Sequence, residues 1–194
     1  MRVSAAAGVV ALALGALAHG AAGAPKTSCP ANWAKGWQRL ADKVAAPVYC
    51  PTWMPNPLDA RIGGQYEDIY SIGKDRSYLV SFLEHGDLGS GDVHVNFRAY
   101  PGRTTIPRCP APVGKTTVPC FADPVGHMTA NGIRATVYQV NQGADQWHIL
   151  LAWWHAGSLY SVSQHVINPY DSATRIRENL QRLLKGLVLV QPAG

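Results

Sequence analysis

Two histidines and two aspartates lie close together in the stretch HGDLGSGDVH, which runs from His85 to His94. If residues 88–91 form the tip of a β-hairpin, Asp87 faces Asp92 and His85 faces His94, all on one face of the sheet. Imidazoles and carboxylates are ligands that Zn²⁺ and other divalent ions take from proteins. These four residues are therefore a candidate metal site. The alternative is a polar hairpin tip without any cofactor, which we expect because Asp and Gly are common turn residues.

A second pair of histidines, His148 and His165, would meet across the last hairpin of the chain if its loop has two residues. The pairing requires a two-residue loop at Ala156 and Gly157, because a three-residue loop would give each histidine another partner. We expect these imidazoles to be buried or stacked and assign them no function.

Four aromatic residues near the last hairpin could line a pocket for a sugar or a lipid: Trp147, Trp153, Trp154 and Tyr160. Core packing is the simpler interpretation. Because side chains alternate along a strand, the adjacent Trp153 and Trp154 must point to opposite faces. These two are the candidate ligand-binding residues, and an exposed tryptophan would favour a binding module.

The chain contains no recognised catalytic motif. A nucleophile elbow, a phosphate-binding loop, a zinc-protease helix and a dinucleotide fingerprint are all missing from the sequence. We therefore assign no catalytic residue.

Strands that would position these residues are predicted from alternating apolar and polar side chains. Val93, Val95, Phe97 and Ala99 share one face, and their polar neighbours share the other. An Asn131-Gly132 pair predicts a tight hairpin turn. The predicted strands are residues 65–72, 77–85, 93–100, 125–129, 133–140, 146–155 and 159–166.

Two amphipathic helices flank these strands. The first follows Pro30, and the second begins near Asp171 or Ser172, either of which suits a helix N-cap. Their apolar stripes, spaced at i, i+4, i+7, i+8 and i+11, are Trp33, Trp37, Leu40, Ala41 and Val44, and Ile176, Leu180, Leu183, Leu184 and Leu187. We predict an α+β fold in which one antiparallel sheet of about six or seven strands is packed by both helices.

The first 24 residues have the pattern of a secretory signal peptide. Arg2 precedes an apolar run, and Ala22-Gly23-Ala24 fits the cleavage site. We predict cleavage after Ala24, which leaves residues 25–194 as a single domain. The alternative is an uncleaved membrane anchor.

Four cysteines fit an exported protein, because disulfides persist in oxidising compartments. Cys29–Cys50 and Cys109–Cys120 are the predicted pairs, since each encloses one coherent segment. A loop of this size contributes about 3 kcal/mol by constraining the unfolded chain.

The net charge is +5, and it falls to +4 once Arg2 is removed with the leader. Basic and acidic residues alternate, as in Lys74-Asp75-Arg76, and no long run of like charge occurs. Nucleic acid is therefore not an expected partner.

The segments PVY at Pro47–Tyr49 and LLAWWHAGSLYSVS from Leu150 to Ser163, with the closing helix, are similar to parts of a known extracytoplasmic domain. That domain, of unknown function, occurs in Gram-positive anti-sigma-factor-like and sporulation-associated membrane proteins. The similarity covers about the last 65 residues and the short opening segment. This chain departs from the pattern in its signal sequence and its four cysteines. The resemblance implies an exported sensor or binding domain, from a high-GC bacterium to judge by the Ala-rich leader, and implies no catalytic residues.

Three functions are consistent with the sequence. We expect a secreted or cell-envelope module, monomeric and non-catalytic, which binds a protein, a wall component or a small apolar ligand. The alternatives are a small secreted metal-dependent hydrolase centred on residues 85–94 and a purely structural, disulfide-stabilised protein.

Overall fold

The computed structural model describes residues 28–56, 58, 71–86, 89–111, 113–140, 147–166 and 172–194. The predicted leader and most of the predicted strand at residues 65–72 lie outside these ranges. In chain order the elements are α1 (Ala31–Val44), β1 (Val48–Pro51), β2 (Tyr78–Gly86), β3 (Gly89–Tyr100), β4 (Arg108–Pro110), β5 (Thr117–Pro119), β6 (Pro124–Ala130), β7 (Ile133–Val140), β8 (His148–His155), β9 (Ser158–His165), α2 (Ala173–Lys185) and β10 (Leu187–Val190).

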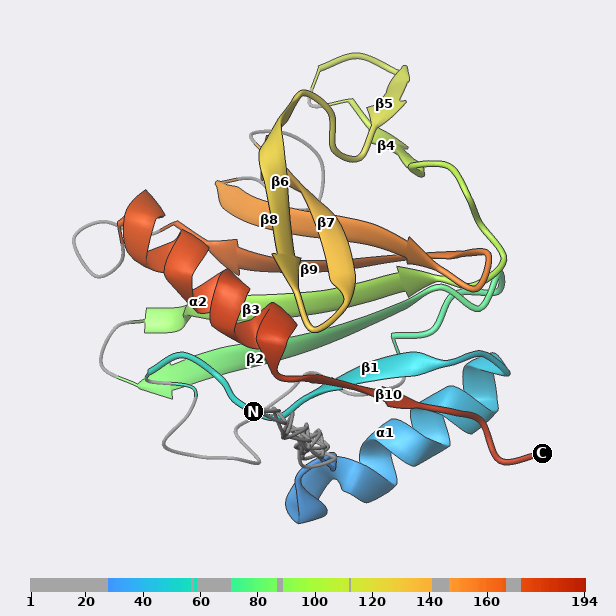
Figure 1. The fold of residues 1–194 in the computed structure, drawn as a ribbon. Coiled ribbons are helices and arrows are strands. Elements are labelled where there is room, and N and C mark those ends of the chain that lie inside the picture. Colours follow the sequence, from blue (N-terminus) through green and yellow to red (C-terminus); the bar gives the residue numbers. More distant parts are fainter. Residues whose placement is uncertain are drawn as a thin grey trace, which may run out of the picture.

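The centre of the molecule is a six-stranded antiparallel sheet in the order β2-β3-β9-β8-β7-β6 (Figure 1). The predicted antiparallel sheet is thus confirmed, with six strands. Neighbouring strands of this sheet are also consecutive in the chain, except at the centre, where β3 pairs with β9 from the other half of the chain. This long-range pairing joins the two sets of predicted strands into one sheet.

One face of the sheet carries the main hydrophobic core. Val93, Val95, Phe97 and Ala99, which were predicted to share a face, are all buried in this core. Trp33 of α1 meets Phe82 edge-to-face with ring centroids 5.4 Å apart, and Trp37 meets Phe97 at 5.9 Å. The apolar stripe of α2 is buried in the same cluster, at Ile176, Leu180, Leu183 and Leu184.

The opposite face of the sheet carries a smaller core near one end. Phe121 and Cys120 pack there against Leu150 and Leu159, with Tyr138 at the side. The segment that supplies Cys120 and Phe121 contains the small β4–β5 sheet and lies beyond the β6–β8 side of the main sheet (Figure 1).

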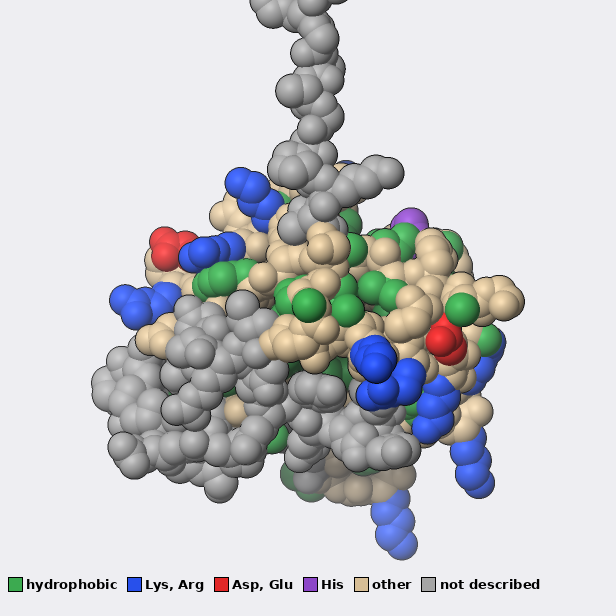
Figure 2. All heavy atoms as spheres, turned by 90° about the horizontal axis from the view of Figure 1, so that it is seen from below, with side chains coloured by type: hydrophobic (Ala, Val, Ile, Leu, Met, Phe, Trp, Pro, Cys, Tyr) green, Lys and Arg blue, Asp and Glu red, His purple; other side chains and the backbone are tan. Residues whose placement is uncertain are grey.

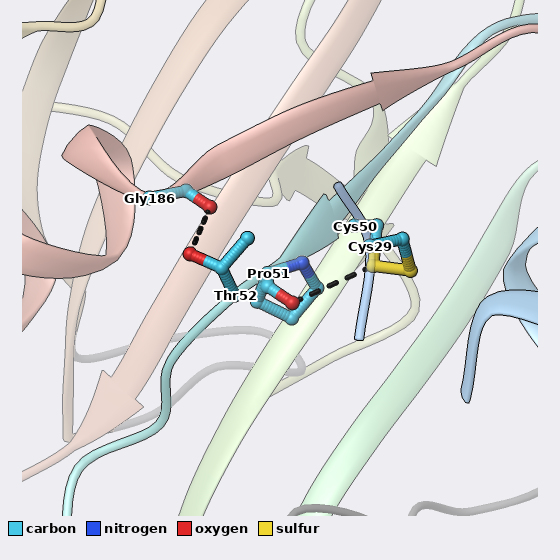
Figure 3. The surroundings of a disulfide bond; sticks show 5 residues. All are labelled: Cys29, Cys50, Pro51, Thr52 and Gly186. Atoms are coloured by element: carbon cyan, nitrogen blue, oxygen red, sulfur yellow. Dashed lines mark hydrogen bonds between the residues drawn. A yellow bond between two sulfur atoms is a disulfide. The ribbon is translucent and has the colours of Figure 1, made fainter. Parts of the chain in front are cut away.

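The last strand, β10, was not predicted. Leu187 fits the apolar stripe of the preceding helix, but α2 ends at Lys185 and Leu187 begins β10, which pairs with β1. Glycine at position 186 allows Thr52 to approach closely, because a Cβ there would lie 2.6 Å from Thr52 Oγ1. The same hydroxyl donates to the carbonyl of Gly186 at 2.8 Å (Figure 3).

Both predicted disulfides are present. Cys29–Cys50 ties the start of α1 to β1 (Figure 3), and Cys109–Cys120 joins β4 to the residue after β5. The sequence separations are 21 and 11 residues. Neither of the described helices has the length and hydropathy that crossing a membrane requires.

Candidate functional site

The predicted pairing of His85 with His94 across the hairpin is wrong. Leu83 pairs with His94, and His85 pairs with Ser90, so the two histidines do not face each other. Between these two pairs lie one residue of β2 and three residues of β3, so the register shifts there, as it does at a β-bulge. The side chains of His85, Asp87 and Asp92 lie outside the described residues.

His94 instead belongs to a row of three histidines that crosses the middle of the sheet. His148 pairs directly with His165, as predicted for a two-residue loop at residues 156–157. Val95 pairs with Gln164, so the next residues, His94 and His165, are neighbours on the same face of the sheet. The row therefore runs from β3 through β9 to β8, on the face opposite the main core.

The three imidazoles are in mutual contact. Their ring centroids are 4.7 Å apart for His94 and His148, 4.9 Å for His94 and His165, and 5.0 Å for His148 and His165. The Nε2 atoms of His94 and His148 are 2.8 Å apart, so one must donate a hydrogen bond to the other. His148 is buried, whereas the other two are partly exposed.

The three histidines are not arranged as the ligands of one metal ion. Within the described ranges, no group of three or more His, Cys, Asp or Glu side chains is arranged so that it could hold a metal ion. The reason lies in ring orientation, because the rings of His148 and His165 are stacked with their planes 20° apart.

Polar side chains continue along this face next to the histidines. Ser81, Asn96 and Ser163 occupy the adjacent row and are buried, and the Ser81 hydroxyl donates to Asn96 Oδ1 at 2.7 Å. Buried polar side chains need hydrogen-bond partners, which limits how far this face can rearrange.

The two candidate tryptophans point to opposite faces, as strand alternation predicts. Trp153 is 3% exposed and packs against Tyr49 and Tyr160 in the main core, so it is structural. Trp154 is 44% exposed, and its Nε1 donates to the carbonyl of Thr104 at 2.8 Å.

A cavity of about 680 Å³ lies beside Thr104, between the end of β3 and the β4–β5 segment. Its wall includes two arginines, Arg103 and Arg108, and one carboxylate, Asp75. The remaining lining residues are Tyr100, Thr105, Ile106, Pro107, Cys109 and Cys120.

The charged groups of the cavity are held by local hydrogen bonds. The Asp75 carboxylate accepts from the Ser77 hydroxyl at 2.5 Å and from its backbone N–H at 3.1 Å, and it pairs with Arg103 at 3.2 Å. These contacts, the Ser77 bonds first, hold the pKa of Asp75 below its ordinary value. Arg108 donates through Nε to Thr117 Oγ1 at 2.7 Å, which fixes the guanidinium on β5.

The cavity was missed in the sequence because its lining comes from segments without periodic pattern. The predicted Cys109–Cys120 disulfide indicates that this segment is cross-linked, but not which side of it lines a cavity. Comparison with protein-family models, curated proteins and solved structures gave no match for the chain. The functional argument therefore rests on the geometry.

Proposed function

We propose that this protein is an extracytoplasmic, non-catalytic binding module whose ligand is a small amphipathic anion. The observation that carries the proposal is the cavity of about 680 Å³ with two arginines in a wall that also contains apolar surface. Its volume falls in the range of pockets that take small organic molecules, which are typically about 300–1,000 Å³.

The charge of the cavity favours an anion. Arg103 and Arg108 contribute two positive charges and Asp75 one negative charge, so the net charge of the lining is +1. Arg108 is held by an uncharged partner, Thr117, and its charge is therefore not neutralised by that contact. Planar guanidinium groups suit carboxylate and other oxyanions, which they bind through paired N–H groups.

The rest of the wall favours an apolar body on the same ligand. Tyr100, Ile106 and Pro107 lie beside the Cys109–Cys120 disulfide. The exposed Trp154 is held next to the cavity through Thr104, which stands between the lining residues Arg103 and Thr105. An acidic component of the cell envelope would combine these two properties.

Two further observations support the proposed location and partner class. Both disulfides suit an oxidising compartment, in agreement with the secretory pattern of residues 1–24. Figure 2 shows Lys and Arg side chains spread around one face of the molecule, with apolar side chains between them. On that face the described Lys and Arg side chains form no continuous stripe of the kind that binds nucleic acid, which favours a small ligand.

The test uses a matched pair of fluorescent probes on the untagged protein. The anion 8-anilinonaphthalene-1-sulfonate and the neutral N-phenyl-1-naphthylamine share an apolar body and differ in charge. We expect saturable binding of the anion that Arg108→Gln or Arg103→Gln weakens by about tenfold, because a hydrogen bond to a charged group contributes roughly 1.5 kcal/mol. Binding of the neutral probe should change little.

Asp75→Asn should have the opposite effect. The substitution leaves Arg103 without its counter-charge, so we expect the anionic probe to bind up to about fivefold more tightly, within the range for an exposed ion pair. Arg39→Gln on the exposed side of α1 is the control for net charge. The proposal fails if all three arginine substitutions weaken binding of the anionic probe equally, or if its binding does not saturate.

A further inference from the structure

The row of three histidines on β3, β9 and β8 lies apart from the cavity and has a geometry of its own. On β3, His94 is six positions before Tyr100 of the cavity wall, which is roughly 20 Å along a strand. We propose that His94, His148 and His165 form a site for a divalent transition metal such as Zn²⁺, independent of the proposed anion site.

Ring spacing is the first argument. A zinc ion binds an imidazole nitrogen at roughly 2.1 Å, which places the ring centre roughly 3.2 Å from the ion, so three rings on one ion have centres about 5 Å apart. The three measured separations, 4.7, 4.9 and 5.0 Å, are all close to this value. The spacing of the rings therefore fits three ligands of one ion.

The position of the nitrogens is the second argument. Two nitrogens on one ion are about 3 Å apart, and the Nε2 atoms of His94 and His148 already face each other at 2.8 Å. Without an ion, this contact requires that one Nε2 carries a proton and the other does not. With an ion between them, each imidazole is neutral, binds through Nε2 and carries its proton on Nδ1.

His165 must then turn to complete the site. Its ring is now stacked on His148, which is why the described side chains do not form a finished metal site. The torsional preference about the bond to a histidine ring is broad, so the ring has an alternative to its stacked orientation that directs a nitrogen at the ion. His165 and His94 are partly exposed, which leaves an ion a path to the buried His148.

The backbone holds the three residues in place for binding. His148 and His165 are directly paired, and the register of β3 on β9 is fixed over six consecutive pairs. Ligands on paired strands lose little freedom when an ion binds. An all-imidazole set favours Zn²⁺, Cu²⁺ or Ni²⁺ over Ca²⁺ and Mg²⁺, which prefer oxygen ligands. Three histidines would leave a fourth position for water.

The experiment is a titration of the untagged, metal-free protein with Zn²⁺ by calorimetry, and with Co²⁺ by visible absorption. We expect one equivalent of Zn²⁺ to bind and Co²⁺ to develop the intense bands of a low-coordinate nitrogen site. His94→Gln and His165→Gln should each weaken Zn²⁺ binding at least tenfold. His127→Gln on β6 and His155→Gln at the end of β8 are matched controls, since both histidines are exposed and lie outside the row.

His148→Gln removes a buried group and can unfold the protein, so the two partly exposed positions decide the outcome. Thermal melts of both variants establish that they are folded. Binding that is absent, or that the His94 and His165 substitutions leave unchanged, overturns the proposal and leaves a hydrogen-bonded histidine cluster. A loss of anionic-probe binding in the arginine variants would not alter this result, so the two proposals are tested separately.

Discussion

At the scale of single residues, the buried tyrosines show how burial sets the pH range of stability. The Tyr160 hydroxyl donates to the carbonyl of Pro47 at 2.8 Å, and the residue is 1% exposed. Burial, partly offset by a hydrogen bond with Ser158, raises the pKa of Tyr160 to about 12. Burial also raises the pKa of Tyr78.

We predict that the protein loses stability between about pH 10 and pH 12. In this window the unfolded state releases the Tyr160 proton, whereas the folded state retains it. The contribution is therefore fully present below pH 10 and is lost as the pH rises through the folded pKa. A rise of the pKa from 10.0 to about 12 corresponds to about 3 kcal/mol. Urea unfolding at a series of alkaline pH values measures the decline.

Tyr160→Phe is the matched variant for this prediction. It should lower the free energy of unfolding by about 1 kcal/mol at neutral pH, because the Pro47 carbonyl loses its donor. The free energy of unfolding should fall less steeply at alkaline pH than in the natural protein, because the contribution of Tyr160 is gone. Part of the decline should remain, because Tyr78 and the other tyrosines still titrate. Equal slopes in the two proteins would contradict the assignment to Tyr160.

At the scale of elements, two hairpin turns of the sheet have the same backbone shape and different residues. Asn131 and Gly132 join β6 to β7 with φ of 52° and 72°, and Ala156 and Gly157 join β8 to β9 with φ of 47° and 72°. Two positive φ values in a two-residue turn are the geometry that Asn-Gly prefers. Ala156 therefore adopts the left-handed conformation at a cost that Asn131 largely avoids.

We predict that Ala156→Asn raises the free energy of unfolding by about 0.5–1 kcal/mol. The converse change, Asn131→Ala, should lower it by more than this amount, because Asn131 Nδ2 also donates to the carbonyl of Leu187 at 2.8 Å. Urea unfolding of the two variants gives both values. A destabilising Ala156→Asn would show that the turn tolerates alanine without strain.

The sequence predicted those parts of the elements that depend on neighbouring residues. Alternation correctly placed Val95 and Phe97 in the core and separated Trp153 from Trp154, because successive side chains of a strand point to opposite faces. Local patterns contain no information about which strands pair over long distances. The meeting of His94 with His165 depends on the β3–β9 register, and for that reason the histidine row was not predicted.

Leu187 shows a different limit of local patterns. Its spacing from Leu183 and Leu184 suits a helix, and its neighbours Val188 and Val190 suit a strand. The choice is made by Gly186, which ends α2, and by β1, which offers a pairing edge. Periodicity alone cannot decide between two such continuations of the chain.

At the scale of the whole molecule, β1 and β10 join segments that are far apart in the chain. Val48 pairs with Val190 and Pro51 with Leu187. Leu187 is buried in the same core as α1 and α2. The ladder therefore connects both helices, and we expect the described elements to unfold together rather than in separate steps.

Leu187→Ala tests this cooperativity. We predict that it lowers the free energy of unfolding by about 2–4 kcal/mol, the usual cost of truncating a buried leucine. Val188→Ala, on the same strand but outside the main core, should cost less than about 1 kcal/mol.

Urea unfolding is followed by far-ultraviolet circular dichroism, which reports the sheet and helices, and by tryptophan fluorescence, which includes Trp33 and Trp37 of α1. The two signals should shift together in Leu187→Ala. A transition that appears first in only one signal would mean that β10 and its neighbours unfold separately from the central sheet.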